Sequence, residues 1–189
     1  MGKVGDTPNT RATRARIVTA TATVIGGRGI RGVAIRDLLE ASGVSRRTFY
    51  LHFANFDEVL VVLYDDVMTR MLTGVVEAVQ QADGDRIDAA VHAYLQFHID
   101  EGPLLTVIMS ESMAPYSVLA PRRVAALANF EEMFRSIEAT PRDPLLYRAL
   151  FSGLGTMVMH AKADGPLDED RRARVHAVMA TMIRAVLGS

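Results

Sequence analysis

Apolar residues repeat at helical spacing along almost the whole chain, and no stretch alternates long enough to indicate a β-strand. Gly and Pro interrupt the repeat at intervals, for example at Gly102-Pro103, where a helix is expected to end. Nearly half of the 189 residues are hydrophobic, which is enough to build a substantial core. The pattern therefore predicts an all-α fold of about nine helices.

Helix boundaries follow from the same breaks and from capping residues. Gly26, Gly27 and Gly29 are expected to end the first helix. Ser45 is placed to cap the third, and Asn55 with Glu58 forms a capping pair for a long fourth helix that reaches the break at Ala82–Asp85. The other expected helices cover about residues 11–25, 35–42, 86–101, 104–113, 121–139, 145–163 and 168–187.

Charge is distributed unevenly along the sequence. Residues 1–52 carry nine Lys and Arg against three Asp and Glu, a balance of +6, whereas residues 53–189 have a balance of −7. A basic segment attached to an acidic remainder is typical of a head that binds a polyanion and a body with another task. The alternative is a chance cluster of solvated arginines.

The segment from Ile35 to Phe53 has the length of a helix-turn-helix, with the turn at Gly43. In such a motif the second helix enters the major groove of DNA. Arginine suits that groove because its guanidinium can donate two parallel hydrogen bonds to guanine. Val44, Phe49 and Phe53 are spaced to pack inward, whereas Arg46, Arg47, Thr48 and Tyr50 point largely elsewhere. The alternative is a small helical hairpin with an exposed Arg pair.

The string Gly43–Phe53, GVSRRTFYLHF, resembles the TetR-family signature G-V-S-x-x-T-[FL]-Y-x-H-F. The close resemblance covers about Arg11–Tyr64, and the rest is similar only in layout. It implies a DNA-binding domain at residues 11–55 that runs into the fourth helix to about residue 71. A flexible basic arm is expected at residues 1–10, and a ligand-binding and dimerisation domain at 56–189. The implied DNA-binding residues are Arg36, Ser45, Arg46, Arg47, Thr48, Tyr50 and His52.

Two positions depart from the family pattern. Ala34 stands where the family often has a Thr that caps the second helix and contacts phosphate. Phe56 stands where a Lys is common, so the usual phosphate clamp at the start of the fourth helix is in doubt. Arg28 and Arg31 are the cations just upstream of the second helix, where they could compensate.

The body is rich in Met and aromatic residues. Under the family resemblance such residues line a ligand cavity, with flexible Met side chains that adapt to shape. The alternative is an ordinary core. The expected pocket residues are Tyr64, Met68, Met71, Tyr94, Phe97, His98, Met109, Met113, Phe130, Met133 and Phe134.

Small residues on the second-last helix and a wide apolar face on the last predict a dimer that closes a four-helix bundle. The alternative is that both faces pack within one chain. The expected interface residues are Ala149, Ser152, Gly153, Thr156, Val175, Val178, Met179 and Met182.

Several function classes are not expected. The chain has no Cys, so disulfides and thiolate sites are excluded, and no apolar run is long enough to span a bilayer. The polar N-terminus lacks the apolar region of a secretory signal. The histidines lack metal-site spacing, and no catalytic arrangement stands out, so we expect neither a metal, a cofactor nor an enzyme. A cytoplasmic location fits these features.

The sequence thus predicts a homodimeric regulator that binds a palindromic DNA operator, represses transcription and is released by a small, mostly apolar or amphipathic ligand. One alternative is an activator, or a regulator whose DNA binding the ligand tightens. A less favoured one is a small-molecule-binding module or enzyme whose DNA-binding head is vestigial.

Overall fold

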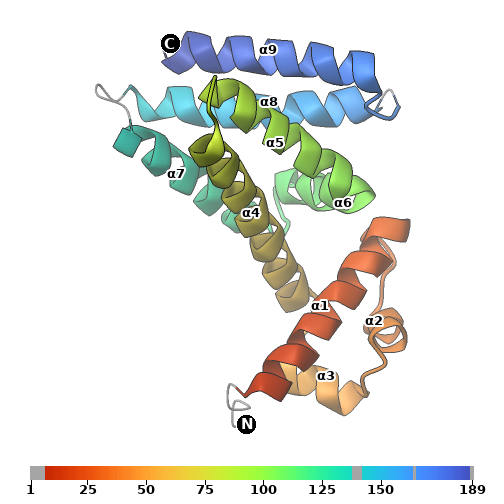
Figure 1. The fold of residues 1–189 in the computed structure, drawn as a ribbon. Helices are drawn as coiled ribbons and strands as arrows, with labels where there is room; N and C mark the ends of the chain where they lie inside the picture. Colours follow the sequence, from red (N-terminus) through yellow and green to blue (C-terminus); the bar gives the residue numbers. More distant parts are fainter. Residues whose placement is uncertain (1–6, 138–141, 164, 188–189) are drawn as a thin grey trace. The chain divides into compact units, whose positions relative to one another are not determined.

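The computed structural model describes residues 7–137, 142–163 and 165–187, and these contain nine α-helices and no strand. The predicted all-α fold is confirmed (Figure 1). None of the helices in these ranges is long and apolar enough to cross a bilayer. The helices are α1 (Pro8–Arg28), α2 (Ile35–Ser42), α3 (Arg46–His52), α4 (Phe56–Gln81), α5 (Arg86–Asp100), α6 (Gly102–Met113), α7 (Ala120–Ile137), α8 (Pro144–Ala163) and α9 (Glu169–Leu187).

Contacts divide the chain into two compact units. Unit 1 holds the described residues up to Val67 together with Gly102–Arg122, and unit 2 holds Met68–Glu101 together with the described residues from Arg123 onward. Helix α4 begins in unit 1 and continues in unit 2. Helix α6 packs against α1 and belongs to unit 1.

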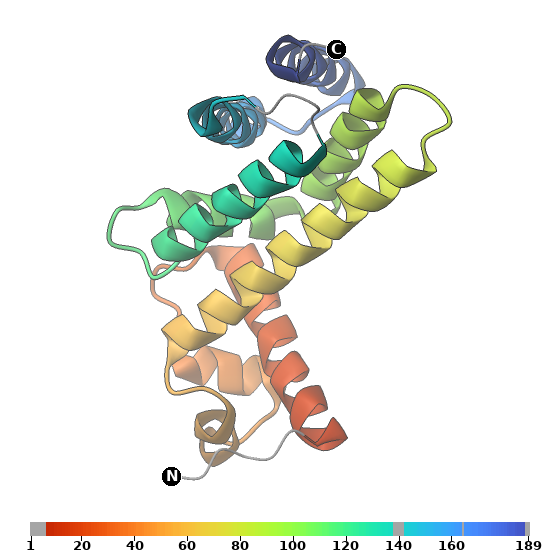
Figure 2. The same ribbon diagram turned by 90° about the vertical axis from the view of Figure 1, so that its left-hand side faces the viewer.

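The core of unit 1 is formed by side chains from α1, α2, α3 and the first turns of α4. Figure 2 shows the ribbon of these helices. Ile17 of α1, Leu38 of α2 and Phe49 of α3 have no exposed surface, and Phe53 and Val59 join them. Side chains from four helices in one cluster fix the angles between those helices, because interiors are closely packed. The core thus holds α3 in a defined orientation on α1 and α2.

Helix α1 is longer than the sequence predicts at both ends. It begins at Pro8, where Thr7 accepts a hydrogen bond from the backbone N–H of Thr10 at 3.2 Å, so it starts within the predicted arm. Residues 1–6 of that arm lie outside the described residues. Gly26 and Gly27 do not end the helix, which runs to Arg28 and stops at Gly29 with φ 79°. Gly26 faces Leu104 of α6, because a Cβ placed there would lie 3.5 Å from the Leu104 Cβ, whereas Gly27 is exposed. Packing of α1 on α6 thus offsets the weak helix propensity at Gly26.

The core of unit 2 is built from α5, α8 and α9. Leu95 of α5, Val158 of α8 and Met179 of α9 are almost fully buried in one cluster. Helices α8 and α9 run side by side, and α5 also packs along α9 (Figure 1). Val175 and Met179, predicted at a dimer interface, lie inside this cluster at 7% and 1% exposure. These two side chains are therefore packed within their own chain, and their predicted role at a dimer interface stays a prediction.

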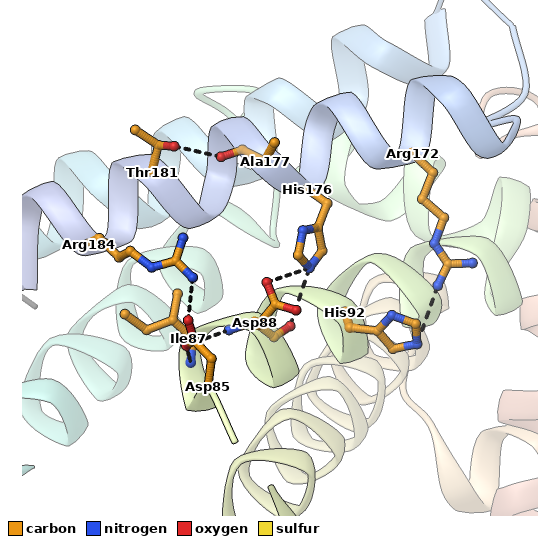
Figure 3. Close-up of polar contacts among 9 residues, drawn as sticks. All are labelled: Asp85, Ile87, Asp88, His92, Arg172, His176, Ala177, Thr181 and Arg184. Atoms are coloured by element: carbon orange, nitrogen blue, oxygen red, sulfur yellow. Dashed lines mark hydrogen bonds and ion pairs between the residues drawn. The ribbon is translucent and has the colours of Figure 1, made fainter. Parts of the chain in front are cut away.

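A row of polar contacts, the α5–α9 polar seam, joins the edges of these two helices (Figure 3). The two helices run antiparallel along the seam, because residues later in α5 contact residues earlier in α9. Asp85 also starts α5, because its Oδ1 accepts the backbone N–H of Ile87 at 2.9 Å. The Asp88 backbone N–H donates to the same oxygen at 3.2 Å. Hydrogen bonding to the Arg184 guanidinium, and then to the backbone N–H groups of Asp88 and Ile87, lowers the pKa of the Asp85 carboxyl. The pairs are Asp85 with Arg184, Asp88 with His176, and His92 with Arg172.

Candidate nucleic-acid interface

The turn between α2 and α3 has the local chemistry that the sequence predicts. Gly43 follows α2 with φ 64°, a left-handed conformation that favours glycine, and its N–H donates to the Leu39 carbonyl at 2.9 Å. Ser45 then caps α3, because its Oγ accepts the backbone N–H of Thr48 at 3.0 Å. The turn and cap fix where α3 begins.

Helix α3 has a buried face and an exposed face. Phe49 and Phe53 are buried to 0% and 1% exposure and Val44 to 7%, which confirms the three predicted packing positions. Arg46 and Arg47, in the first turn of the same helix, are exposed. Two guanidinium groups are thus presented on a helix whose orientation the core fixes. Such a surface can donate paired hydrogen bonds to base edges or to phosphates.

The hydroxyls of Ser45 and Thr48 hydrogen-bond to each other at 2.8 Å. Each hydroxyl has a single hydrogen, so this pair uses one of the two available. Only one of these residues can therefore donate to a phosphate while the pair persists. Ser45 is exposed and Thr48 half-buried, which leaves both within reach of a bound polyanion.

Tyr50 and His52 lie at the end of α3. Tyr50 is 38% exposed, and its ring meets the ring of Phe49 edge-on with centroids 5.4 Å apart. His52 is half-buried, and its backbone carbonyl accepts a hydrogen bond from Arg14 at 2.9 Å. Contact with Phe49 thus limits the motion of the Tyr50 ring.

Arg14 is a structural residue of the site that the sequence prediction missed. Its guanidinium donates to the last carbonyl of α3 and lies 4.3 Å above the ring centroid of Phe53. Arg14 therefore ties α1 to the C-terminal end of α3. Its spacing was the available signal, because it stands three residues before Ile17 and so shares the buried face of α1.

The start of α2 lacks a side-chain cap from Ala34, as the sequence indicated. Asp37 serves this end instead, because its Oδ2 accepts the Ala34 N–H at 2.7 Å. Arg28 forms an ion pair with the same carboxylate at 3.0 Å. The Ala34 bond and then Arg28 lower the pKa of Asp37. Arg28 is thus engaged with Asp37, whereas Arg31 and Arg36 are exposed.

Phe56 is the first residue of α4 and packs against the core of unit 1. The Phe56 ring is thus part of the packing of unit 1. At the same end of α4 the predicted capping pair is present, since Asn55 Oδ1 accepts the Glu58 N–H at 2.9 Å.

The predicted pocket residues fall in both units, and each unit is described by itself. Tyr64 is buried in unit 1, where Met109 is half-buried and Met113 is 39% exposed. In unit 2, Met68, Met71 and His98 are buried, whereas Tyr94, Phe97 and Phe130 are half-buried. The side chains of Met133 and Phe134 lie outside the described residues.

Unit 2 has an open hollow that the sequence prediction did not include. It is lined by the end of α4 and the start of α5, at Ala78, Ala82, Gly84, Asp85, Asp88, Ala89, His92 and Ala93. None of the predicted pocket residues lines it. Within the described ranges, no group of three or more His, Asp or Glu side chains is arranged to hold a metal ion.

The predicted interface residues on α8 and α9 differ in exposure. Ala149 and Val178 are exposed, so a second chain can reach them. Ser152, Gly153, Thr156 and Met182 are half-buried. Gly153 faces its own chain in part, because a Cβ placed there would lie 3.6 Å from the Met182 Cε.

A family model described as "Bacterial regulatory proteins, tetR family" matches residues 17–62. This segment runs from α1 through the turn and α3 into the first turns of α4. None of the curated proteins matches the sequence.

Several solved structures share the fold over nearly the whole length. A putative TetR-family transcriptional regulator from Syntrophomonas wolfei is 13% identical, with a TM-score of 0.73, and covers 94% of this chain and 96% of its own. Another putative TetR-family transcriptional regulator, from Rhodococcus sp., is 19% identical, with a TM-score of 0.69, and covers 94% of this chain and 99% of its own. A multidrug binding protein, EbrR, complexed with imidazole is 19% identical, with a TM-score of 0.67, covering 89% and 93%.

The family model accounts for the helix-turn-helix segment, and these neighbours share the all-helical fold around it. Residues 17–62 therefore match the tetR family of bacterial regulatory proteins, and the chain as a whole has the all-helical fold of these solved structures.

Proposed function

We propose that this regulator is a repressor that binds a palindromic operator as a homodimer and is released by a small, mostly apolar ligand. The observation that carries the DNA-binding part is the split of α3 into a buried aromatic face and an exposed face with Arg46 and Arg47. In this proposal Arg46 and Arg47 read base edges. Arg36, Thr48, Tyr50 and His52 contact phosphates or flanking bases, and Ser45 sets the start of the reading helix.

The dimer in this proposal forms through the outer faces of α8 and α9. Ala149 and Val178 lie at its centre, and Val175 and Met179 are left out because they are buried. Two half-sites one helical turn apart, about 34 Å, require two heads held together. Val178→Arg should give mostly monomer in sedimentation, because it puts a charge into an apolar contact. Val124→Arg, also at an exposed valine but on α7, is the matched control.

Ligand release needs a route from the body to the head. Two features of the chain support one: α4 continues from unit 1 into unit 2, and α6, which packs on α1, directly follows α5 of unit 2. A ligand that favours one body conformation shifts the population of head positions only by its difference in affinity for the two states. The multidrug binding protein among the neighbours supports small-molecule binding by this fold.

Footprinting on the DNA upstream of the chain's own coding region tests the proposal. We expect a protected palindrome of two half-sites, with scrambled DNA of equal length as the control. Sequence-specific binding would be contradicted if the upstream DNA showed no protection at any salt concentration. It would also be contradicted if the scrambled DNA were protected equally well. A single protected half-site would contradict the dimer but not the DNA binding.

A further inference from the structure

His98 of α5 is buried at 2% exposure in unit 2, and its ring Nε2 has no hydrogen-bond partner among the described residues. Roughly nine in ten buried polar groups or more in proteins have a partner, so this nitrogen is an exception that calls for a function. It is the one atom of this kind within the described part of the chain.

Two neighbours hold the His98 residue in place. The Tyr94 ring, one turn earlier on α5, meets the His98 ring edge-on with centroids 4.7 Å apart. Lys162 of α8 donates from Nζ to the His98 backbone carbonyl at 3.0 Å. Burial, and then the positive charge of Lys162, lower the pKa of His98 to about 3. The ring is therefore neutral at physiological pH, with its position fixed.

An ordinary core role does not account for a histidine at this position. A Phe ring would fill a similar volume and make the same contact with Tyr94, without leaving a polar atom buried and unpaired. Burying such an atom without a partner destabilises the folded state. Positions that break a packing rule in this way are often functional sites.

We propose that His98 Nε2 is the hydrogen-bonding group of the effector site and that it selects a neutral, mostly apolar molecule with a hydroxyl group. The inference rests on the proposed ligand-dependent function and specifies the chemistry of its ligand. A hydroxyl fits because it can donate as well as accept, and so pairs with either tautomer of the neutral ring. A charged ligand group is disfavoured by the same burial that keeps His98 neutral.

Matched pairs of fluorescent probes test this on the full-length protein without DNA: 1-naphthol against naphthalene, and 4-phenylphenol against biphenyl. Each hydrocarbon is the more apolar member of its pair, so a purely apolar cavity favours the hydrocarbon. We expect the wild-type protein to bind the hydroxyl-bearing member of at least one pair about tenfold more tightly.

Three variants assign this preference to one atom. His98→Phe keeps a ring and should bring the two members of the pair to equal affinity or favour the hydrocarbon. His98→Gln keeps a hydrogen-bonding group and should retain part of the preference. Tyr94→Phe removes the adjacent hydroxyl and should leave the preference unchanged. His98→Phe should also melt no lower than the wild type, since it removes an unpaired polar atom.

Three results would overturn the inference: no probe binding up to the solubility limit, a wild-type protein that favours the hydrocarbons, or a hydroxyl preference that survives in His98→Phe. A buried water that satisfies Nε2 would give the second of these. In another outcome, a probe binds with the His98-dependent hydroxyl preference and yet leaves the affinity of the protein for its operator unchanged. That result would contradict ligand-released repression and leave this inference intact. The two proposals therefore fail in different measurements.

Discussion

The DNA-binding head and the body contain the same kinds of apolar residue but differ in how clearly burial assigns their roles. In α3 of the head, Phe49 is fully buried and Arg47, two residues earlier, is exposed. In α5 of the body, Leu95 and His98 share one buried face although only Leu95 belongs to the apolar core cluster. Opposed faces on one short helix identify a binding surface, whereas burial in the body does not separate core from ligand site.

The contrast has a physical cause. A surface that reads DNA must be polar and exposed, so it differs from the packing face in chemistry as well as in position. A cavity for an apolar molecule is lined by the residue types that also fill cores. In the body, a buried polar atom without a hydrogen-bond partner, such as His98 Nε2, is what distinguishes a candidate ligand-site residue from a core residue.

The largest expected effect tests the packing face of the head. Phe49→Ala should lower the free energy of unfolding by about 3–5 kcal/mol, because it leaves a cavity at a fully buried position. Leu51→Ala, two residues later and 45% exposed, is the matched control and should cost far less. Urea denaturation followed by circular dichroism measures both. Equal costs would mean that α3 is not packed as described.

The next effect tests the exposed face. Arg46→Ala or Arg47→Ala should weaken binding to the operator by about 1–3 kcal/mol while binding to random DNA changes little. The unfolding free energy should stay near that of the wild type, because both side chains are exposed. Gel shifts on operator and random DNA measure the difference. An equal loss on both DNAs would assign these arginines to phosphates alone.

Where local chemistry decides the structure, sequence alone predicted the head well. Gly43 at the turn, Ser45 as a cap and the three packing positions of α3 follow from spacing and from the preferences of a few side chains. The Asn55–Glu58 pair at the start of α4 belongs to the same class. Each of these features is set within a few residues of the chain.

Where contacts between distant segments decide, the sequence was less informative. Helix α1 continues past Gly26, which faces Leu104 of α6, a partner far away in sequence. Val175 and Met179 face α5 and α8 of their own chain, which the apolar pattern of α9 could not distinguish from a partner's helices. The roles of the pocket and interface residues remain predictions.

A third effect tests how the head holds its reading helix. Arg14→Met should lower the free energy of unfolding by about 1–2 kcal/mol, because it removes the hydrogen bond to His52 and the contact over Phe53. Operator and random DNA should both be bound more weakly if α3 is less well held. Arg16→Met, exposed on the same helix, is the control for lost charge. Weaker DNA binding with unchanged stability in Arg14→Met would make Arg14 a direct contact.

The smallest effect tests the α5–α9 polar seam through pH. Pairing with Arg184 holds the folded-state pKa of Asp85 below its ordinary value of 3.8, so the unfolded chain binds a proton more readily than the folded one. The contribution of this pair to stability is therefore fully present above about pH 4 and is lost as the pH falls through the folded-state pKa.

Asp85→Asn keeps an oxygen that can cap α5 but removes the charge. The variant should melt slightly below the wild type at pH 7, and the difference should shrink towards pH 3. Asp83→Asn, an exposed carboxylate of the same loop, controls for the change in net charge. The difference in melting temperature between the wild type and Asp85→Asn could instead stay constant from pH 7 to pH 3. That result would show that Asp85 acts only as a helix cap and that its charge does not stabilise the packing of α9.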